Sequence, residues 1–101
     1  MELEFEGRLR LWDARRDEGW TFVDVPTEMA DEILEVAEGV ARGFGSVRVQ
    51  VQIGSTTWRT SLFPGESTYA LPIKKAVRTA EGCEAGDSVH VRIELLDVPR
   101  P

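Results

Sequence analysis

The sequence has 101 residues, 42% of them apolar and 30% charged, a composition typical of one compact globular domain with a single core. Its formal net charge is −6. All of the negative excess lies in the first half, because residues 1–50 carry 12 acids and 6 bases whereas residues 51–101 carry 6 of each. Such a field repels phosphates, so the charge disfavours nucleic acid and anionic membranes as partners.

Cysteine and histidine each occur once, as Cys83 and His90. This excludes a disulfide within the chain and a zinc site built from thiolates and imidazoles of one chain, so we expect no metal and no cofactor. The first residues lack the basic and apolar regions of a secretion signal, and no apolar run is long enough to span a bilayer. We therefore expect a cytoplasmic protein with no membrane partner.

The hydrophobic periodicity predicts about six strands and two helices. Residues 3–11 alternate apolar and charged side chains except at Gly7, which predicts a strand with one buried face and a bend at that glycine. Residues 20–25 are apolar at both parities and predict a strand covered on both faces. Pro26 and Thr27 then begin a helix. The apolar stripe that this helix is expected to bury comprises Met29, Ile33, Val36, Ala37 and Val40.

The second half begins with a predicted hairpin. Residues 47–53 alternate apolar and polar side chains, and Gly54-Ser55 is a compact turn signal. The returning strand, residues 56–63, has two different faces. One face carries Trp58, Thr60 and Leu62, and the other carries Arg59, Ser61 and Phe63.

Residues 69–94 predict a strand, a short helix from Ile73 to about Glu81, a glycine exit at Gly82, a Gly86-Asp87 turn and a last strand. We assign residues 1–97 to a single domain and residues 98–101 to a short C-terminal tail.

The second helix carries its charges in the unfavourable order. Lys74 and Lys75 lie in its first turn, where the helix dipole disfavours cations by about 0.3–1 kcal/mol each. Lysines beside free amide groups suit a phosphate or a carboxylate, and residues 58–78 hold four bases against one acid. We therefore predict a site for an anionic small molecule or a carboxylate. Its candidate residues are Arg59, Ser61, Lys74, Lys75 and Arg78.

A purely structural interpretation of these bases stands beside that prediction. Acids of the first half, such as Glu4, Glu6 and Asp24, are available as partners for surface salt bridges, which contribute only about 0–1 kcal/mol each.

No residues form a recognisable catalytic set, so we expect no catalytic residues. His90 lies on the polar parity of the last strand, where a lone histidine is usually solvated. Ser61 lacks the glycines of a nucleophile elbow, and acidic neighbours such as Asp87 raise the pKa of Cys83. Aromatic residues are expected in the core rather than on a base-stacking platform. They are Trp12, Trp20, Trp58 and Tyr69.

Several motifs occur in one order along the chain. They are Gly19-Trp20-Thr21-Phe22-Val23, Val25-Pro26, Trp58-Arg59-Thr60-Ser61-Leu62-Phe63-Pro64, Tyr69-Ala70-Leu71-Pro72, Lys74-Lys75-Ala76-Val77-Arg78 and Ala85-Gly86-Asp87. Together they resemble the bacterial and archaeal family of unknown function numbered 1905, over nearly the whole chain. The resemblance implies a double-split β-barrel, in which two helices flank about six strands, and it implies no established activity.

The C-terminal third is more distantly similar to AbrB-type and MazE-type transcription factors. Leu71-Pro72, Lys75, Val77-Arg78, Gly82 and Gly86-Asp87 carry this similarity. Those domains are dimers that bind DNA with basic residues on their barrel. The net charge of −6, and the supply of both barrel halves by one chain, depart from that pattern.

Three hypotheses stay open for a non-enzymatic binding domain. It recognises an anionic ligand, it binds nucleic acid as AbrB-like domains do, or it is a structural module that docks a protein partner.

Overall fold

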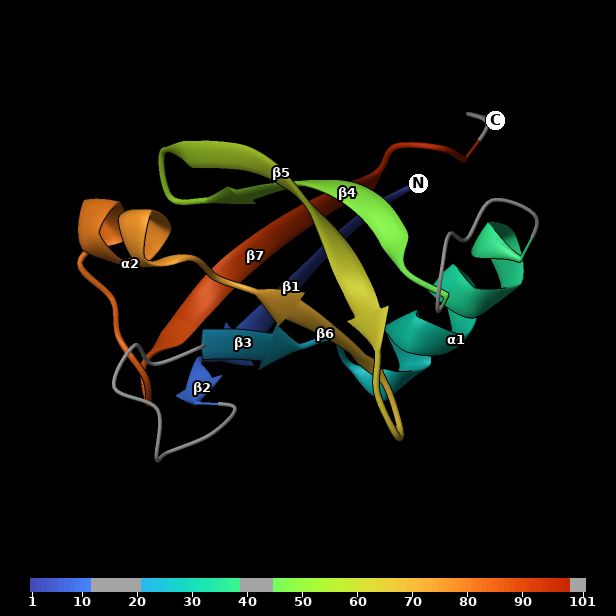
Figure 1. Cartoon of the computed structure of the whole chain (residues 1–101), viewed down its shortest axis with the longest axis horizontal. Coiled ribbons are helices and arrows are strands. Elements are labelled where there is room, and N and C mark those ends of the chain that lie inside the picture. Colours follow the sequence, from blue (N-terminus) through green and yellow to red (C-terminus); the bar gives the residue numbers. More distant parts are fainter. Residues whose placement is uncertain (12–20, 39–44, 99–101) are drawn as a thin grey trace.

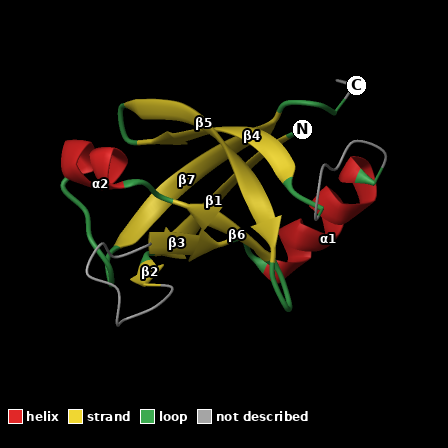
Figure 2. Ribbon diagram, viewed as in Figure 1, coloured by secondary structure: helices red, strands yellow, loops and turns green. Residues whose placement is uncertain are grey.

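The computed structural model describes residues 1–11, 21–38 and 45–98, and in it the chain is mainly β. Seven antiparallel strands form one sheet that is curled into a half-barrel, and two helices lie at opposite ends of its long axis (Figure 1). Figure 2 shows the same view coloured by secondary structure. In chain order the elements are β1 (Glu2–Arg8), β2 (Arg10–Leu11), β3 (Thr21–Asp24), α1 (Thr27–Ala37), β4 (Val47–Ile53), β5 (Thr56–Pro64), β6 (Tyr69–Pro72), α2 (Lys75–Glu81) and β7 (Ser88–Leu95).

The two outer strands of the sheet are consecutive in the chain. The strand order is β1-β7-β4-β5-β6-β3-β2, so β1 and β2 lie at its two ends although only Leu9 separates them. Leu9 itself bonds to the turn before β7, because its amide donates to the carbonyl of Asp87 (2.9 Å) and its carbonyl accepts from the amide of Gly86 (2.8 Å). One continuous segment therefore supplies both outer strands.

This arrangement corrects two details of the sequence analysis. The predicted strand over residues 3–11 is two strands, β1 and β2, so the described residues hold seven strands rather than about six. The break lies at Leu9, where the pairing changes from β7 to β3, and not at Gly7, which stays paired with Val89. Gly7 instead permits close packing, since a Cβ there would lie 2.3 Å from Cγ1 of Val23.

The interior of the curled sheet is filled by branched aliphatic side chains. They come from alternate positions of β3 to β7, as period-2 alternation requires. The side chains with no exposed surface include Val23, Val49, Val51, Leu62, Leu71, Val91 and Ile93.

Helix α1 buries part of the predicted stripe, with one correction at Val36. Ala30, Ile33 and Ala37 are buried, whereas Val36 is 41% exposed. The buried side chains follow a spacing of three and four residues, and Val36 falls beside that row. Met29 packs against the core as expected, and Val40 lies outside the described residues.

The strand predicted over residues 20–25 is covered on one face only. Val23 and Val25 point into the core, but Asp24 is exposed and Phe22 is only half-buried. The outer face of β3 is therefore part of the surface. Trp20 lies outside the described residues.

Helix α2 covers the end of the sheet beside the turn between β4 and β5 (Figure 1). It begins two residues later than predicted, because the backbone of Lys74 is still extended, and because Ile73 is buried and donates its amide to the carbonyl of Thr21. Val77 anchors the helix in the core, and Gly82 ends it in the left-handed conformation (φ 64°), as predicted.

The junction at Leu9 is expected to carry a large share of the stability. Replacing Leu9, which is 1% exposed, by alanine leaves a cavity where the two ends of the sheet meet and should reduce the free energy of unfolding by about 2–5 kcal/mol. Leu11→Ala is the matched control, since Leu11 is 42% exposed and its truncation should change stability by less than about 0.5 kcal/mol. Chemical denaturation measures both; equal effects would contradict this role of Leu9.

Candidate functional site

The five predicted ligand residues come from two places in the fold. Arg59 and Ser61 lie on the outer face of β5, opposite Gln50 and Arg48 of β4. Arg59 is exposed and donates from Nε to Oε1 of Gln50 (3.3 Å), and Ser61 is half-buried. In the part of the chain that the structure describes, no hydrogen bond or ion pair joins these two residues to the other three.

The other three predicted residues lie at α2. Lys74 is the N-cap residue, with an extended backbone (φ −68°, ψ 156°) and no side-chain cap, and Lys75 is the first helical residue. Both lysines are exposed. Arg78 is half-buried, and its Nε donates to the carbonyl of Ile73 (3.3 Å). Arg78 therefore binds backbone at the start of its own helix.

The acids that were proposed as structural partners pair with other bases. Asp24 forms a two-bond ion pair with Arg10 (2.7 and 2.8 Å). Glu4 lies across the sheet from Arg92, to which it is bonded (3.2 Å). The suggestion that these acids neutralise the bases of residues 59–78 is wrong, because β-sheet register places Glu4 and Glu6 beside β7, and Asp24 of β3 bonds to Arg10 of the neighbouring β2.

His90 is exposed, as expected, but both of its ring nitrogens have carboxylate partners. Nε2 lies 2.9 Å from Oε1 of Glu4 and Nδ1 lies 3.3 Å from Oε1 of Glu6. These hydrogen bonds raise the pKa of His90, and the hydrogen bonds from His90 and Arg92 lower the pKa of Glu4. The cluster joins β1 to β7 and holds the imidazole against the outer face of the sheet.

Strand β7 has an open edge along its first half. It pairs with β1 over its length from Ser88 to Glu94, but with β4 only over residues 92–95. In β7 and the residues that flank it, the odd-numbered residues make their backbone hydrogen bonds to the β1 side: Leu95 donates to Met1, and Asp87 accepts from Leu9. The even-numbered residues bond to the other side, as Leu96 does when it donates to Arg48 of β4. Because both polar groups of a residue in an antiparallel strand point the same way, those of Ser88 and His90 point to the β4 side. There, among the described residues, they have no backbone partner.

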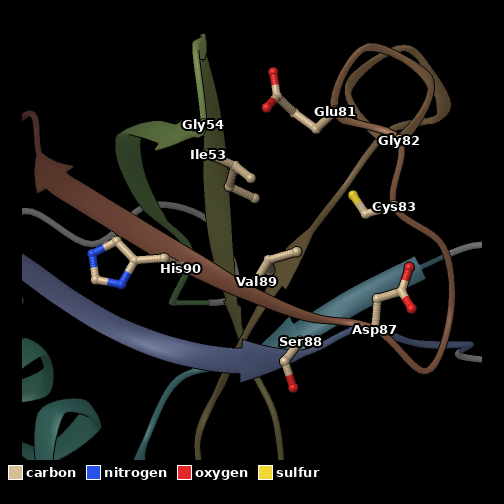
Figure 3. A pocket seen from close by; sticks show the side chains of 9 residues that line it. All are labelled: Ile53, Gly54, Glu81, Gly82, Cys83, Asp87, Ser88, Val89 and His90. Carbon is tan, nitrogen blue, oxygen red and sulfur yellow. The ribbon is translucent and has the colours of Figure 1, made fainter.

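A hollow of about 460 Å³ lies beside this edge (Figure 3). It is bounded by the end of α2, the turn after β4 and the start of β7. The residues that line it are Ile53, Gly54, Glu81, Gly82, Cys83, Asp87, Ser88, Val89 and His90. Its volume falls within the range of about 300–1,000 Å³ that is usual for ligand pockets.

Hydrogen bonds fix the two carboxylates of the hollow. Oε2 of Glu81 accepts from the hydroxyl of Thr56 (2.5 Å), and Oδ2 of Asp87 accepts from the amide of Glu84 (2.9 Å). Gly54 makes room for the first, because a Cβ at that position would lie 1.8 Å from Oε1 of Glu81. The hollow is therefore polar and negative on the side of α2.

The hollow is not arranged for nucleophilic catalysis. Burial raises the pKa of the Cys83 thiol, and the carboxylates of Asp87 and Glu81 raise it further, as their acidic character predicts. Figure 3 shows Cys83 on the same side of β7 as Val89, and His90 on the other side. The described residues contain no cluster of three or more histidine, cysteine, aspartate or glutamate side chains suited to a metal ion. They also contain no helix long and apolar enough to cross a membrane.

A second, apolar hollow lies on the outer face of β3 and β6. Its volume is about 420 Å³, and its floor includes Phe22, Phe63, Ala70 and Pro72. Phe63 is 48% exposed, and the Arg10 guanidinium stacks on Phe22 at 5.7 Å from the ring centroid. The pairing of Arg10 with Asp24 leaves this surface without net charge.

Sequence reasoning missed both hollows. The turn signal at Gly86-Asp87 located the start of β7 but gave no indication that β4 ends before reaching it. Trp58 and Tyr69 pack against or within the core as expected, and Trp12 and Trp20 lie outside the described residues. Only the odd-even alternation of β7 was available as a signal for which backbone groups face the open edge.

The histidine cluster predicts a pH dependence. A raised His90 pKa gives stabilisation that is complete below the unfolded value of 6.5 and is lost as pH rises through the folded value. A lowered Glu4 pKa gives stabilisation that is present above 4.5 and lost as pH falls through the folded value. The cluster should therefore stabilise most between pH 4.5 and 6.5.

NMR titration of the His90 ring measures this directly. Glu4→Gln and Glu6→Gln should each lower its midpoint toward 6.5, while Glu2→Gln, on the same face of β1 but opposite Glu94, should leave it unchanged. A wild-type midpoint at or below 6.5 would show that the carboxylates do not hold the charged ring.

Comparison with known proteins gives one family. No curated protein matches the sequence. The family model described as "Domain of unknown function (DUF1905)" matches residues 5–93, which covers most of the chain and includes every residue that lines the two hollows. This confirms the resemblance inferred from the motifs: the chain belongs to the DUF1905 family of domains of unknown function.

Proposed function

We propose that this domain is a non-catalytic module that docks a protein partner by adding an extended segment of that partner to the open edge of β7. The observation that carries the proposal is the pair of residues Ser88 and His90, whose four backbone polar groups face a hollow instead of a neighbouring strand. Strand addition to a free edge is a common mode of peptide recognition, in which main-chain hydrogen bonds supply the affinity.

The edge suits this use because it is short and held in place. β1 fixes Ser88 to Val91 from the other side, and the glutamates on β1 hold the ring of His90 away from the hollow. The edge therefore needs little ordering when a partner binds, which lowers the entropic cost of association. Each backbone hydrogen bond to the partner replaces a hydrogen bond to water and contributes about 0.5–1.5 kcal/mol to the free energy of binding. Four such bonds are consistent with a weak, reversible complex.

Strand addition can be tested with a proline at the edge. Ser88→Pro removes an amide that β1 does not use, and proline is tolerated on an edge strand, so the fold should persist while binding is lost. Ser88→Ala keeps the amide and is the matched control. With the extended peptide Ac-Thr-Lys-Thr-Lys-Thr-NH2 as probe, amide exchange at His90 should slow in wild type and in Ser88→Ala but not in Ser88→Pro, which has no amide at residue 88.

Two results would contradict the proposed strand addition. One is an unchanged exchange rate of the Ser88 and His90 amides in wild type at millimolar peptide. The other is equal binding by Ser88→Pro, provided that thermal unfolding shows this variant to be folded.

A second candidate is recognition of an anion by Lys74 and Lys75, with Arg59, Ser61 and Arg78 nearby in the sequence. It is supported by one observation: both lysines are exposed, and neither has an ion-pair partner in residues 1–11, 21–38 or 45–98. Lysine at an N-cap is also a poor choice for stability, because serine or aspartate there accepts a bond from the helix amides.

Lys74→Ser separates these two effects. The new cap should raise the free energy of unfolding by about 0.5–2 kcal/mol in the absence of any ligand. If the lysines bind anions, the same variant should lose the amide shifts that pyrophosphate induces at residues 73–78 in wild type. An absence of saturable shifts in wild type would eliminate the anion site.

AbrB-like binding of nucleic acid receives less support from the geometry. The net charge of −6 repels phosphates, and the bases exposed on β7, His90 and Arg92, are already bonded to glutamates of β1. We also propose that the fold is the double-split β-barrel that the family resemblance implies. The strand pairing supports this proposal: β5 pairs with β4 and then, at its last two residues, with β6, and the segment of β1 and β2 pairs with β7 and then with β3.

A further inference from the structure

The chemistry of the hollow indicates which partner segment fits the edge of β7. This inference rests on the proposed strand addition. Three residues that line the hollow can carry a charge: Glu81 at the end of α2, Asp87 in the turn before β7, and His90. The ring of His90 points to the other side of β7 (Figure 3), so the two charges on the side of Val89 are both acidic. No lysine or arginine lines it. A basic side chain is therefore complementary to the hollow, and an acidic one is not.

In each of the two carboxylates, one oxygen accepts hydrogen bonds from the described residues and the other accepts none. Oε2 of Glu81 is the oxygen that accepts from Thr56 and Ser55, and Oδ2 of Asp87 is the one that accepts from the Glu84 amide. Among the described residues, Oε1 of Glu81 and Oδ1 of Asp87 have no hydrogen-bond donor. The existing bonds hold each carboxylate in place without using its full capacity to accept hydrogen bonds.

The pleat of an added strand decides which of its side chains reaches these oxygens. Successive side chains of a strand point to opposite faces. Figure 3 shows Glu81, Cys83 and Asp87 on the same side of β7 as Val89, while Ser88 and His90 point to the other side. Every second side chain of an added strand therefore enters the hollow, over Val89 and Ile53 and toward the two carboxylates.

Lysine and arginine have the shape that this position requires. Their aliphatic stems pack against apolar surface while the charged head reaches polar groups, and the floor of the hollow is apolar with acids at its edge. We propose that the partner is an extended protein segment with a lysine or arginine at the position that enters the hollow, between Glu81 and Asp87.

The test compares two probes that differ only in charge, Ac-Thr-Lys-Thr-Lys-Thr-NH2 and Ac-Thr-Glu-Thr-Glu-Thr-NH2, titrated against the 15N-labelled full chain. The lysine peptide should bind about tenfold more tightly than the glutamate peptide, judged from the saturation of amide shifts at Ser88 and His90. The preference should fall to about twofold or less in the variant Glu81→Gln with Asp87→Asn, because each replacement keeps its hydrogen-bond acceptor and removes its charge. Glu84→Gln is the matched control, since Glu84 is an exposed acid on the same loop that does not line the hollow.

The possible outcomes distinguish the preference for a basic partner from the proposed strand addition on which it rests. If both peptides bind equally, strand addition stands and the basic partner is wrong. If the lysine preference persists in the doubly neutral variant, or if Glu84→Gln abolishes it, the charge that is recognised lies elsewhere and the inference fails. If neither peptide slows exchange at Ser88 and His90, strand addition itself fails and the basic partner fails with it.

Discussion

The structure depends on one constraint: a single ten-residue segment, residues 2–11, supplies both outer strands of the sheet. β1 pairs with β7 at one end of the sheet, and β2 pairs with β3 at the other end. Because only Leu9 separates β1 from β2, the sheet must curl until its two ends meet there. The bonds of Leu9 to Gly86 and Asp87 fix that meeting point. The curl in turn creates an interior that β-branched and leucine side chains fill completely at the centre.

The open edge of β7 is a consequence of the same constraint. β7 must extend back to Ser88 in order to pair with β1 as far as Arg8, near the junction. β4 has no such requirement, because Gly54 (φ 58°) turns the chain into β5 once Gln52 has paired with Arg92. The first half of β7 is left with one neighbour, and α2 closes the space beyond it only in part, through the contact of Glu81 with Thr56.

Local signals in the sequence predicted the parts of the fold that depend on neighbours in the chain. The alternation over residues 47–53 and the turn at Gly54-Ser55 gave the β4–β5 hairpin, and Gly82 gave the end of α2. The pairing of Glu4 and Glu6 with His90 was out of reach, because it depends on register between strands more than 80 residues apart. The candidate site was missed for the same reason: it exists where one strand continues and another stops, and no local pattern encodes that difference.

A free strand edge is a liability, since it offers unpaired amides and carbonyls to any other chain, a second copy included. Here the edge is only a few residues long and lies in a hollow, so a flat sheet cannot approach it as it would approach an outer strand. The acids of the hollow also disfavour pairing of this edge with a second copy of the chain. Two copies paired through this edge would bring Glu81 and Asp87 of one protomer toward those of the other, and like charges at close range disfavour that pairing. The geometry that leaves the edge open therefore also limits which chains can use it.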